Sequence, residues 1–153
     1  MNGPHVKGNP LKVIASLLLA SYIIGEFFFP KYPLVYIVNL IGVLGLISNV
    51  SIFIYAFYLF KSYEEDPNPT SNTNRIISTG IYAYTRNPIY LSFVGFNISM
   101  FLVFENVMYF LSAIVIAIWL HHWVIKIEED YLLDKFSDEY EKYKSSVNRW
   151  LFF

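Results

Sequence analysis

Two short segments hold most of the side chains that could do chemistry. The first, residues 80–90, combines a flexible glycine, phenol rings, a guanidinium and an amide, namely Gly80, Tyr82, Tyr84, Arg86, Asn87, Pro88 and Tyr90. The second is the adjacent acidic pair Glu128 and Glu129. A guanidinium beside a helix start is suited to an anionic or carboxylate group, and paired carboxylates are suited to an ammonium or a sulfonium.

The first segment leads into a helix. Pro88 suits the first turn of a helix and restricts Asn87 to an extended conformation. The helix N-terminus then offers free N–H groups and a partial positive charge, which favours an anionic ligand. On these residues alone, an alternative remains open: Arg86 contacts lipid phosphate and the tyrosines form an interfacial belt.

The acidic pair follows two histidines at helical spacing. An uninterrupted helix predicts His122 on the same face as Glu129, and His121 on the same face as Glu128. The alternative is a solvated helix end whose charge nearby lysines balance. Adjacent histidines point ~100° apart on a helix, and no HExxH-type spacing is present, so we predict no metal site.

Composition bounds the kind of protein that carries these residues. Apolar residues make up 56% of the 153 residues and charged residues 15%, well below the ~25% charge of soluble domains. This is typical of a membrane protein. The net charge of −1 gives no indication of nucleic-acid binding, and the absence of cysteine excludes thiolate chemistry.

The apolar segments predict an all-α, multi-pass membrane bundle formed by a single domain, residues 1–153. Four segments approach the ~20 residues that a membrane-spanning helix needs: residues 11–29, 33–60, 88–104 and 107–125. A polar loop, residues 61–87, and a tail, residues 126–153, complete the chain. Apolar residues recur at helical spacing in the tail, which predicts an amphipathic helix with a break near Phe136 and a new helix start at Ser137.

Basic residues predict the orientation. With four spans, ten of the eleven lysines and arginines lie on one side of the membrane, and only Lys31 lies opposite. Because positively charged loops stay in the cytoplasm, we expect both termini, the polar loop and the active site there. Glu26 lies near the end of the first span, and we expect it to reach the outer interface beside Lys31.

Taken together, the two segments resemble the integral membrane methyltransferases related to isoprenylcysteine carboxyl methyltransferase and the phospholipid N-methyltransferases. The matching elements are a Gly-x-Tyr and Arg-Asn-Pro-x-Tyr segment (80–90), Glu-Glu-x-x-Leu (128–132), Phe-x-x-x-Tyr-x-x-Tyr (136–143) and a final Arg149. They occur in the family's order, over residues 67–151. Asn87 stands where some members have histidine, and Ser137 where glycine is common.

The resemblance implies a cofactor, S-adenosylmethionine, and a role for each matching residue. The cofactor is expected where the Arg-x-Pro segment and the tail meet, with its amino-acid end held by Glu128 and Glu129. Gly80, Tyr82, Asn87, Pro88, Tyr90 and His122 are expected to line that site. Arg86, with Asn87, is expected to carry the catalytic role by orienting a substrate carboxylate or headgroup.

The function predicted by this resemblance is methyl transfer to a lipophilic or membrane-embedded acceptor. Membrane lipids are expected partners, and the acceptor itself is a lipophilic small molecule or a lipid. A phospholipid amine is the alternative acceptor. Two hypotheses of other classes are an NADPH-dependent membrane reductase, since sterol reductases share a similar Arg-His-Pro-x-Tyr layout, and a non-enzymatic membrane scaffold.

Overall fold

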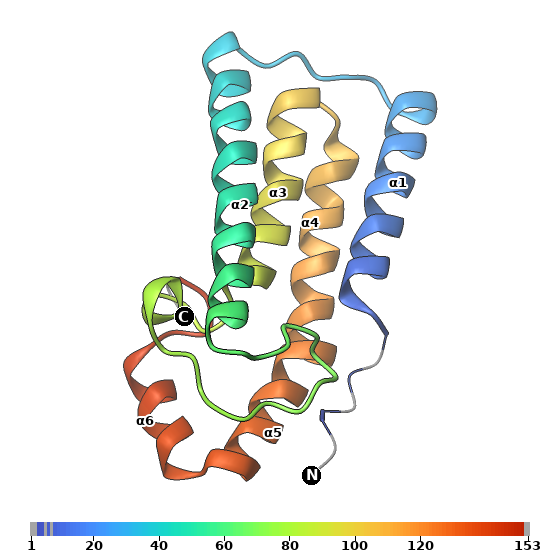
Figure 1. Ribbon diagram of the computed structural model, residues 1–153. Coiled ribbons are helices and arrows are strands. Elements are labelled where there is room, and N and C mark those ends of the chain that lie inside the picture. The colour runs from blue at the N-terminus through green and yellow to red at the C-terminus, as the bar shows by residue number, and fades with distance from the viewer. Residues whose placement is uncertain (1–2, 5, 7, 152–153) are drawn as a thin grey trace.

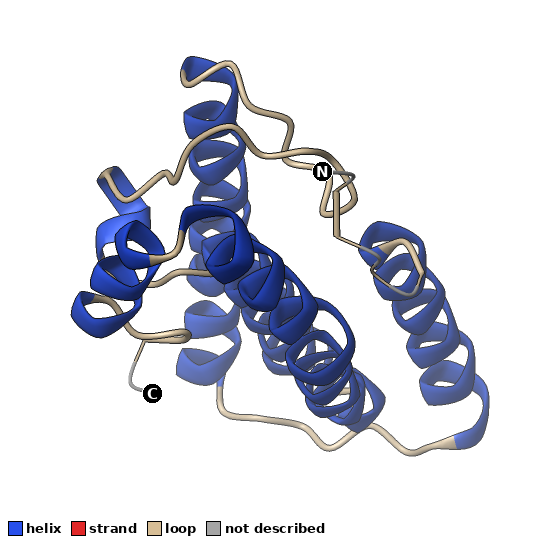
Figure 2. Ribbon diagram, turned by 90° about the horizontal axis from the view of Figure 1, so that it is seen from below, coloured by secondary structure: helices blue, strands red, loops and turns tan. Residues whose placement is uncertain are grey.

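The computed structural model describes residues 3–4, 6 and 8–151, and every regular element in these residues is helical (Figures 1 and 2). Four long helices form the bundle: α1 (Pro10–Phe28), α2 (Tyr36–Ser62), α3 (Pro88–Phe104) and α4 (Val107–Leu120). The remaining elements are a 3-10 helix (Gly80–Ala83), a π-helical turn (His121–Ile125), α5 (Lys126–Phe136) and α6 (Asp138–Ser146). The predicted all-α fold class is confirmed.

The bundle helices pack in the order α2, α3, α4, α1, so that α1 and α2 lie at its outer edges (Figure 1). The π-helical turn continues α4 directly into α5. Helices α5 and α6, the long loop between α2 and α3, and both ends of the described chain gather at the same end of the bundle. The residues predicted to do chemistry therefore lie at that end.

Three helices in the described residues are long and apolar enough to cross a membrane: α1, α2 and the continuous helix Val107–Phe136. Helix α3 has 17 residues, or ~25 Å of rise, slightly less than the ~30 Å hydrocarbon core. It packs between α2 and α4. The protein is therefore a membrane helical bundle, as predicted.

Helix ends follow local capping chemistry. The Asn9 side chain caps α1 by accepting hydrogen bonds from the N–H groups of Leu11 and Lys12, at 3.0 and 3.3 Å. Helix α2 begins at Tyr36 and not at residue 33 as predicted, because Pro30 and Pro33 lie in extended chain before it. The predicted range 88–104 coincides with α3, whereas the helix predicted for 107–125 begins at Val107 and continues through the π-helical turn and α5 to Phe136.

Polar contacts close the opposite end of the bundle. Glu105, between α3 and α4, has φ +56°. Its Oε1 accepts hydrogen bonds from the N–H of Leu34 at 2.9 Å and from the amide of Asn39 at 3.1 Å. The expected contact between Glu26 and Lys31 is present, with 3.1 Å between the charged atoms. These contacts fix the α1–α2 linker against the α3–α4 turn.

Candidate functional site

Gly80 allows the 3-10 helix to lie directly against α2. Its φ is +58°, and a Cβ at this position would lie 2.7 Å from Tyr55 Oη and 2.9 Å from Leu59 Cδ1. Both the conformation and the contact therefore exclude a larger residue. The turn buries Tyr82, whose carbonyl oxygen accepts a 2.7 Å hydrogen bond from the hydroxyl of Tyr143 on α6. Thus α6 is held against the segment that precedes α3.

The end of the tail runs beside residues 85–87. The Arg86 N–H donates to the carbonyl of Asn148 at 3.0 Å, and the buried Thr85 hydroxyl donates to the carbonyl of Arg149, also at 3.0 Å. The Asn87 side-chain amide donates to the same Arg149 carbonyl at 3.1 Å. Asn87, predicted as a catalytic residue, thereby holds the tail in place. Thr85 was not singled out by the sequence, since a lone threonine carries no signal for such a contact.

A carboxylate shared by two guanidinium groups joins three separate parts of the chain. Arg86 Nη2 donates to Glu129 Oε1 at 2.8 Å, and Arg149 donates to both Glu129 oxygens, one of them at 3.1 Å. The Arg86 and Glu129 side chains are 8% and 7% exposed, and that of Arg149 is 22% exposed. Arg86 Nη1 also donates to two tail carbonyls, those of Lys144 and Val147.

Electrostatics keep this carboxylate ionised. Burial on its own would raise the pKa of Glu129, but the hydrogen bonds and charges of Arg149 and Arg86 outweigh burial and lower it. Both oxygens of Glu129 are already occupied by guanidinium donors. Arg86 does not contact lipid, because its side chain is buried against α5 and the tail.

Glu128 lies in a different environment from its neighbour. Its Oε1 accepts a 2.8 Å hydrogen bond from the hydroxyl of Tyr90 on α3, and its side chain lines a cavity. Glu128 lies beyond the apolar part of the helix, which ends before Lys126. Burial raises the pKa of Glu128 to about 8, although the hydrogen bond from Tyr90 acts in the opposite direction. The two acids thus have opposite pKa shifts, and only Glu128 faces open space.

The cavity, including the open space at its mouth, has a volume of about 820 Å³. Its wall includes six of the predicted site residues, namely Tyr82, Arg86, Asn87, Pro88, Tyr90 and Glu128. Gly80, His122 and Glu129 are not part of that wall. Arg86 Nε is buried without a hydrogen-bond partner among the described residues. An unpaired donor of this kind is suited to a carboxylate ligand.

The long loop between α2 and α3 forms the remaining wall, which sequence reasoning did not identify. Asn72 Oδ1 accepts hydrogen bonds from the Tyr131 hydroxyl and the Lys135 ammonium of α5, each at 2.6 Å. The buried Glu65 accepts a 2.9 Å hydrogen bond from the N–H of Asn74. The loop consists of turn-forming residues without a regular hydrophobic period, so its sequence does not predict these contacts. The loop is therefore fastened to α5 and covers the cavity.

The π-helical turn overturns one prediction about helix faces. A π turn adds a residue to the helical repeat and so shifts the faces on either side of it. Arg149 consequently contacts both His121, at 3.2 Å, and Glu129. The predicted pairing of His122 with Glu129 is wrong: His122 is exposed, whereas Glu129 is buried.

The fold and cavity define a class: a helical membrane protein with a cavity at one end of its bundle. A family model described as phospholipid methyltransferase matches residues 34–139, and the chain belongs to that family. This confirms the resemblance drawn from the motifs.

Individual relatives match shorter parts of the chain. It is 33% identical over 72 residues to Protein-S-isoprenylcysteine O-methyltransferase of Saccharomyces cerevisiae, a match that covers 47% of this chain and 30% of the yeast protein. It is 36% identical over 63 residues to an uncharacterized protein of Haemophilus influenzae, covering 41% of this chain and 100% of that protein. The chain thus matches less than a third of the yeast enzyme's length.

Proposed function

We propose that this protein transfers a methyl group from S-adenosylmethionine to a lipophilic acceptor. The observation that carries the proposal is the pairing, in one cavity wall, of the Glu128 carboxylate with the unpaired Nε of Arg86. The amino-acid end of S-adenosylmethionine carries an ammonium and a carboxylate, which are complementary to these two groups. Family membership supports the same reaction class.

The cavity residues differ in what they offer. Glu128 would accept hydrogen bonds from the ammonium, and Arg86 Nε would donate to the carboxylate. The rings of Tyr82, Tyr140 and Tyr143, which also line the cavity, would stabilise a nearby cation by ~0.5–2 kcal/mol. When bound, S-adenosylmethionine would supply a methyl group on a positively charged sulfur. Asn87 acts here as a positioning residue, because it holds the tail beside the cavity.

Glu129 has a supporting role in this proposal. Its two oxygens hold Arg86 and Arg149, which leaves Glu128 as the member of the pair that can receive an ammonium. Arg86, which lines the cavity, is oriented by Glu129 and two tail carbonyls, and its buried Nε has no hydrogen-bond partner among the described residues. Orientation of reacting groups supplies several kcal/mol of a transfer barrier, ~7–11 in well-oriented intramolecular reactions.

A second cavity supports a lipophilic acceptor. It occupies about 770 Å³ including its opening, and it shares Ile89, Tyr90 and the loop residues 66–69 with the first cavity. Its remaining wall includes three phenylalanines of the bundle, Phe53, Phe57 and Phe93. An apolar chain in this space would place its polar end next to the first cavity, as methylation of a membrane-embedded acceptor requires.

Two acceptor chemistries are consistent with the site. A carboxylate acceptor, as on a prenylated cysteine, attacks the methyl carbon directly and needs no base. A phospholipid amine must lose a proton, and Glu128 is the carboxylate in the cavity wall with a pKa, about 8, suited to receive it. If Glu128 holds the cofactor ammonium, the carboxylate acceptor is the better match, and it is the one we propose.

Calorimetry with S-adenosylmethionine on protein in lipid nanodiscs tests cofactor binding. At pH 8.5, above the Glu128 pKa of about 8, Glu128→Gln removes a charged hydrogen bond of ~1.5–3 kcal/mol, so we expect binding about 10- to 100-fold weaker. Glu139→Gln, the same change at an exposed position of α6, is the matched control and should bind like the unmodified protein. Saturable binding of NADPH with no binding of S-adenosylmethionine would refute the proposal in favour of a reductase, and binding of neither would favour a scaffold.

Transfer of a radiolabelled methyl group distinguishes the acceptors. A farnesylated cysteine with a free carboxylate is expected to yield a base-labile methyl ester. Phosphatidylethanolamine, tested in parallel, is expected to remain unlabelled. Label in the phospholipid with none in the farnesylcysteine would replace the carboxylate acceptor with an amine.

A further inference from the structure

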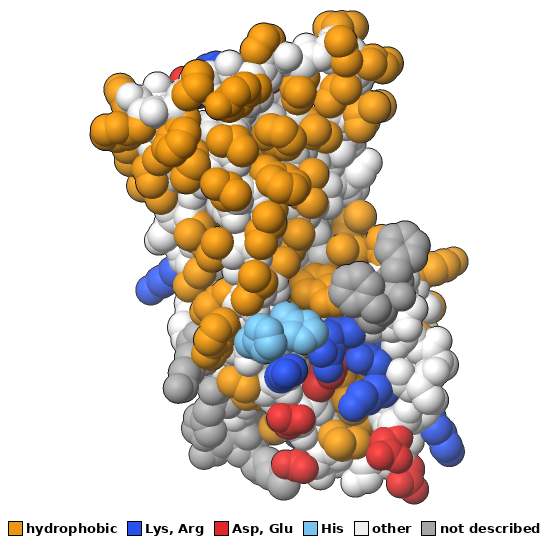
Figure 3. Space-filling view, turned by 180° about the vertical axis from the view of Figure 1, so that it is seen from behind, with side chains coloured by type: hydrophobic (Ala, Val, Ile, Leu, Met, Phe, Trp, Pro, Cys, Tyr) orange, Lys and Arg blue, Asp and Glu red, His pale blue; other side chains and the backbone are white. Residues whose placement is uncertain are grey.

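The π-helical turn presents a compact group of cationic and aromatic side chains on the surface. We call it the π-turn patch, and it consists of His121, His122, Trp123, Lys126 and Arg149. Figure 3 shows the histidines, with lysine and arginine side chains beside them, where the apolar surface of the bundle ends. π turns frequently interrupt regular helices at functional sites, so the side chains of this turn are candidates for a functional contact.

Contacts within the patch keep its members together. The rings of His121 and His122 have centroids 4.9 Å apart, and the His122 ring lies 5.8 Å from that of Trp123. Arg149 Nη1 lies 3.2 Å from His121 Nε2, and the charges of Arg149 and Lys126 both act on the His121 ring. The patch therefore concentrates positive charge and N–H donors in a small area.

The apolar surface leads into the patch along α4. Leu111, Ile114, Val115 and Ile118 are 44–52% exposed and recur every three or four residues, which places them in one strip on the helix. Trp123, itself 44% exposed, follows at the end of that strip. Along this surface, apolar residues are followed by a tryptophan and then by cationic side chains. A lipid has the matching order, from its acyl chain to its headgroup.

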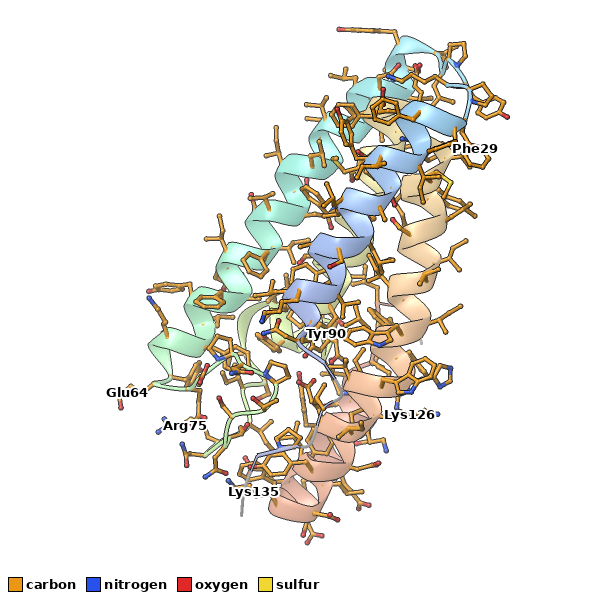
Figure 4. The ribbon with its side chains drawn as sticks, turned by 90° about the vertical axis from the view of Figure 1, so that its right-hand side faces the viewer. Phe29, Glu64, Arg75, Tyr90, Lys126 and Lys135 are labelled. Carbon is orange, nitrogen blue, oxygen red and sulfur yellow. The ribbon has the colours of Figure 1, made fainter. Side chains whose placement is uncertain are left out.

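The patch is separate from the cavity. None of its five residues lines either cavity. Figure 4 shows Lys126 on the side of the α4–α5 helix away from Arg75 and the long loop that covers the cavity. Glu129 pairs with Arg149 and also with Arg86, so these three groups together retain one positive charge. In the described residues no ion pair joins Asp130 to Lys126, which is exposed and adds a second positive charge.

From this arrangement we infer that the π-turn patch binds the phosphate of an anionic phospholipid whose acyl chains lie along the exposed strip of α4. Lys126 and Arg149 supply the positive charge, the histidines add N–H donors, and Trp123 lies at the level of the headgroup. The inference does not depend on the proposed reaction, since lipid binding is measured without methyl transfer.

Binding at this patch has a consequence for the tail. Arg149 is the residue through which the tail contacts both His121 and Glu129. A lipid phosphate near Arg149 stabilises the folded state in which these contacts exist, because a ligand that binds only the folded form raises its stability. An anionic lipid is therefore expected to raise the unfolding temperature of the protein.

Native mass spectrometry with dioleoylphosphatidylglycerol, compared with dioleoylphosphatidylcholine, tests the inference. We expect one phosphatidylglycerol to bind in preference, and Lys126→Gln to weaken that binding about fivefold, as the loss of one basic residue near an anionic lipid predicts. Lys12→Gln is the matched control, because Lys12 is an exposed lysine at the same end of the bundle on α1. It should leave the affinity unchanged.

Three results would overturn the inference. One is equal binding of the two lipids, and another is an equal loss of affinity in both lysine variants, which would indicate a diffuse charge effect. The third is an unfolding temperature that phosphatidylglycerol raises no more than phosphatidylcholine does. Because Lys126 is exposed, Lys126→Gln is expected to unfold at the unmodified temperature in phosphatidylcholine, which serves as the folding control.

Discussion

The shared carboxylate of Glu129 leads to a quantitative prediction about stability. Glu129→Gln retains the shape of the side chain but leaves the charge of Arg86, whose side chain is 8% exposed, without its ionic partner. Breaking a buried pair from one side costs ~3–5 kcal/mol. The amide oxygen of glutamine can still accept one hydrogen bond, so we expect about 3 kcal/mol, at the lower end of that range.

Thermal unfolding in detergent measures this change. For a chain of about 150 residues, each kcal/mol shifts the unfolding temperature by about 2–4 °C, so Glu129→Gln should lower it by about 6–12 °C. Glu141→Gln, at an exposed position on α6, should shift it by less than about 2 °C. Glu128→Gln at pH 7 replaces a carboxyl that is already protonated, and it should not be destabilising.

A double-variant cycle then isolates the pair. If Arg86 is destabilised because it loses Glu129, the combined variant Arg86→Gln and Glu129→Gln should lose less stability than the sum of the two single variants, by at least about 1 kcal/mol. Strict additivity would show that the two groups act independently. A Glu129→Gln protein as stable as Glu141→Gln would contradict the whole account of this network.

Three further predictions concern the cavity. Binding of S-adenosylmethionine should strengthen by up to about tenfold per pH unit from pH 6 towards the Glu128 pKa of about 8, because only the ionised carboxylate binds a cation. In calorimetry, Glu128→Gln should abolish this pH dependence. Tyr131→Phe removes the hydroxyl that joins α5 to Asn72, so the amide hydrogens of residues 70–75 should exchange faster with solvent. Unchanged exchange would show that the loop is held elsewhere. Gly80→Ala places a methyl group 2.7 Å from Tyr55 Oη at a residue with positive φ, so the free energy of unfolding should fall by about 1–3 kcal/mol. An unchanged unfolding temperature would contradict the close approach.

The raised pKa of Glu128 also fixes the sign of a stability effect. In the unfolded chain this carboxyl ionises near the ordinary glutamate pKa of 4.5, whereas in the folded protein its pKa is about 8. Between these values the folded state holds a proton that the unfolded state has lost, so Glu128 lowers stability progressively as the pH rises from about 4.5 to 8. Glu128→Gln should remove that contribution, which comparison of unfolding at pH 6 and pH 8 will measure.

The four long helices and several of their ends could be predicted from the sequence alone. Long apolar runs can satisfy their backbone in lipid only as helices, and proline and asparagine define several boundaries, as at Pro88 and Asn9. The motif spacing also identified six residues of the cavity wall, namely Tyr82, Arg86, Asn87, Pro88, Tyr90 and Glu128. These features are local, since each depends on residues within a turn or two of one another.

Which of the two acids lines the cavity depends on the tertiary structure. Glu128 and Glu129 are adjacent and chemically identical in the sequence, yet one accepts a hydrogen bond from Tyr90 beside the cavity and the other is enclosed by Arg86 and Arg149. The π turn that sets their direction and the tail that brings Arg149 to them depend on packing between distant segments. Periodicity along the chain contains no information about such packing, because it assumes a regular helix throughout.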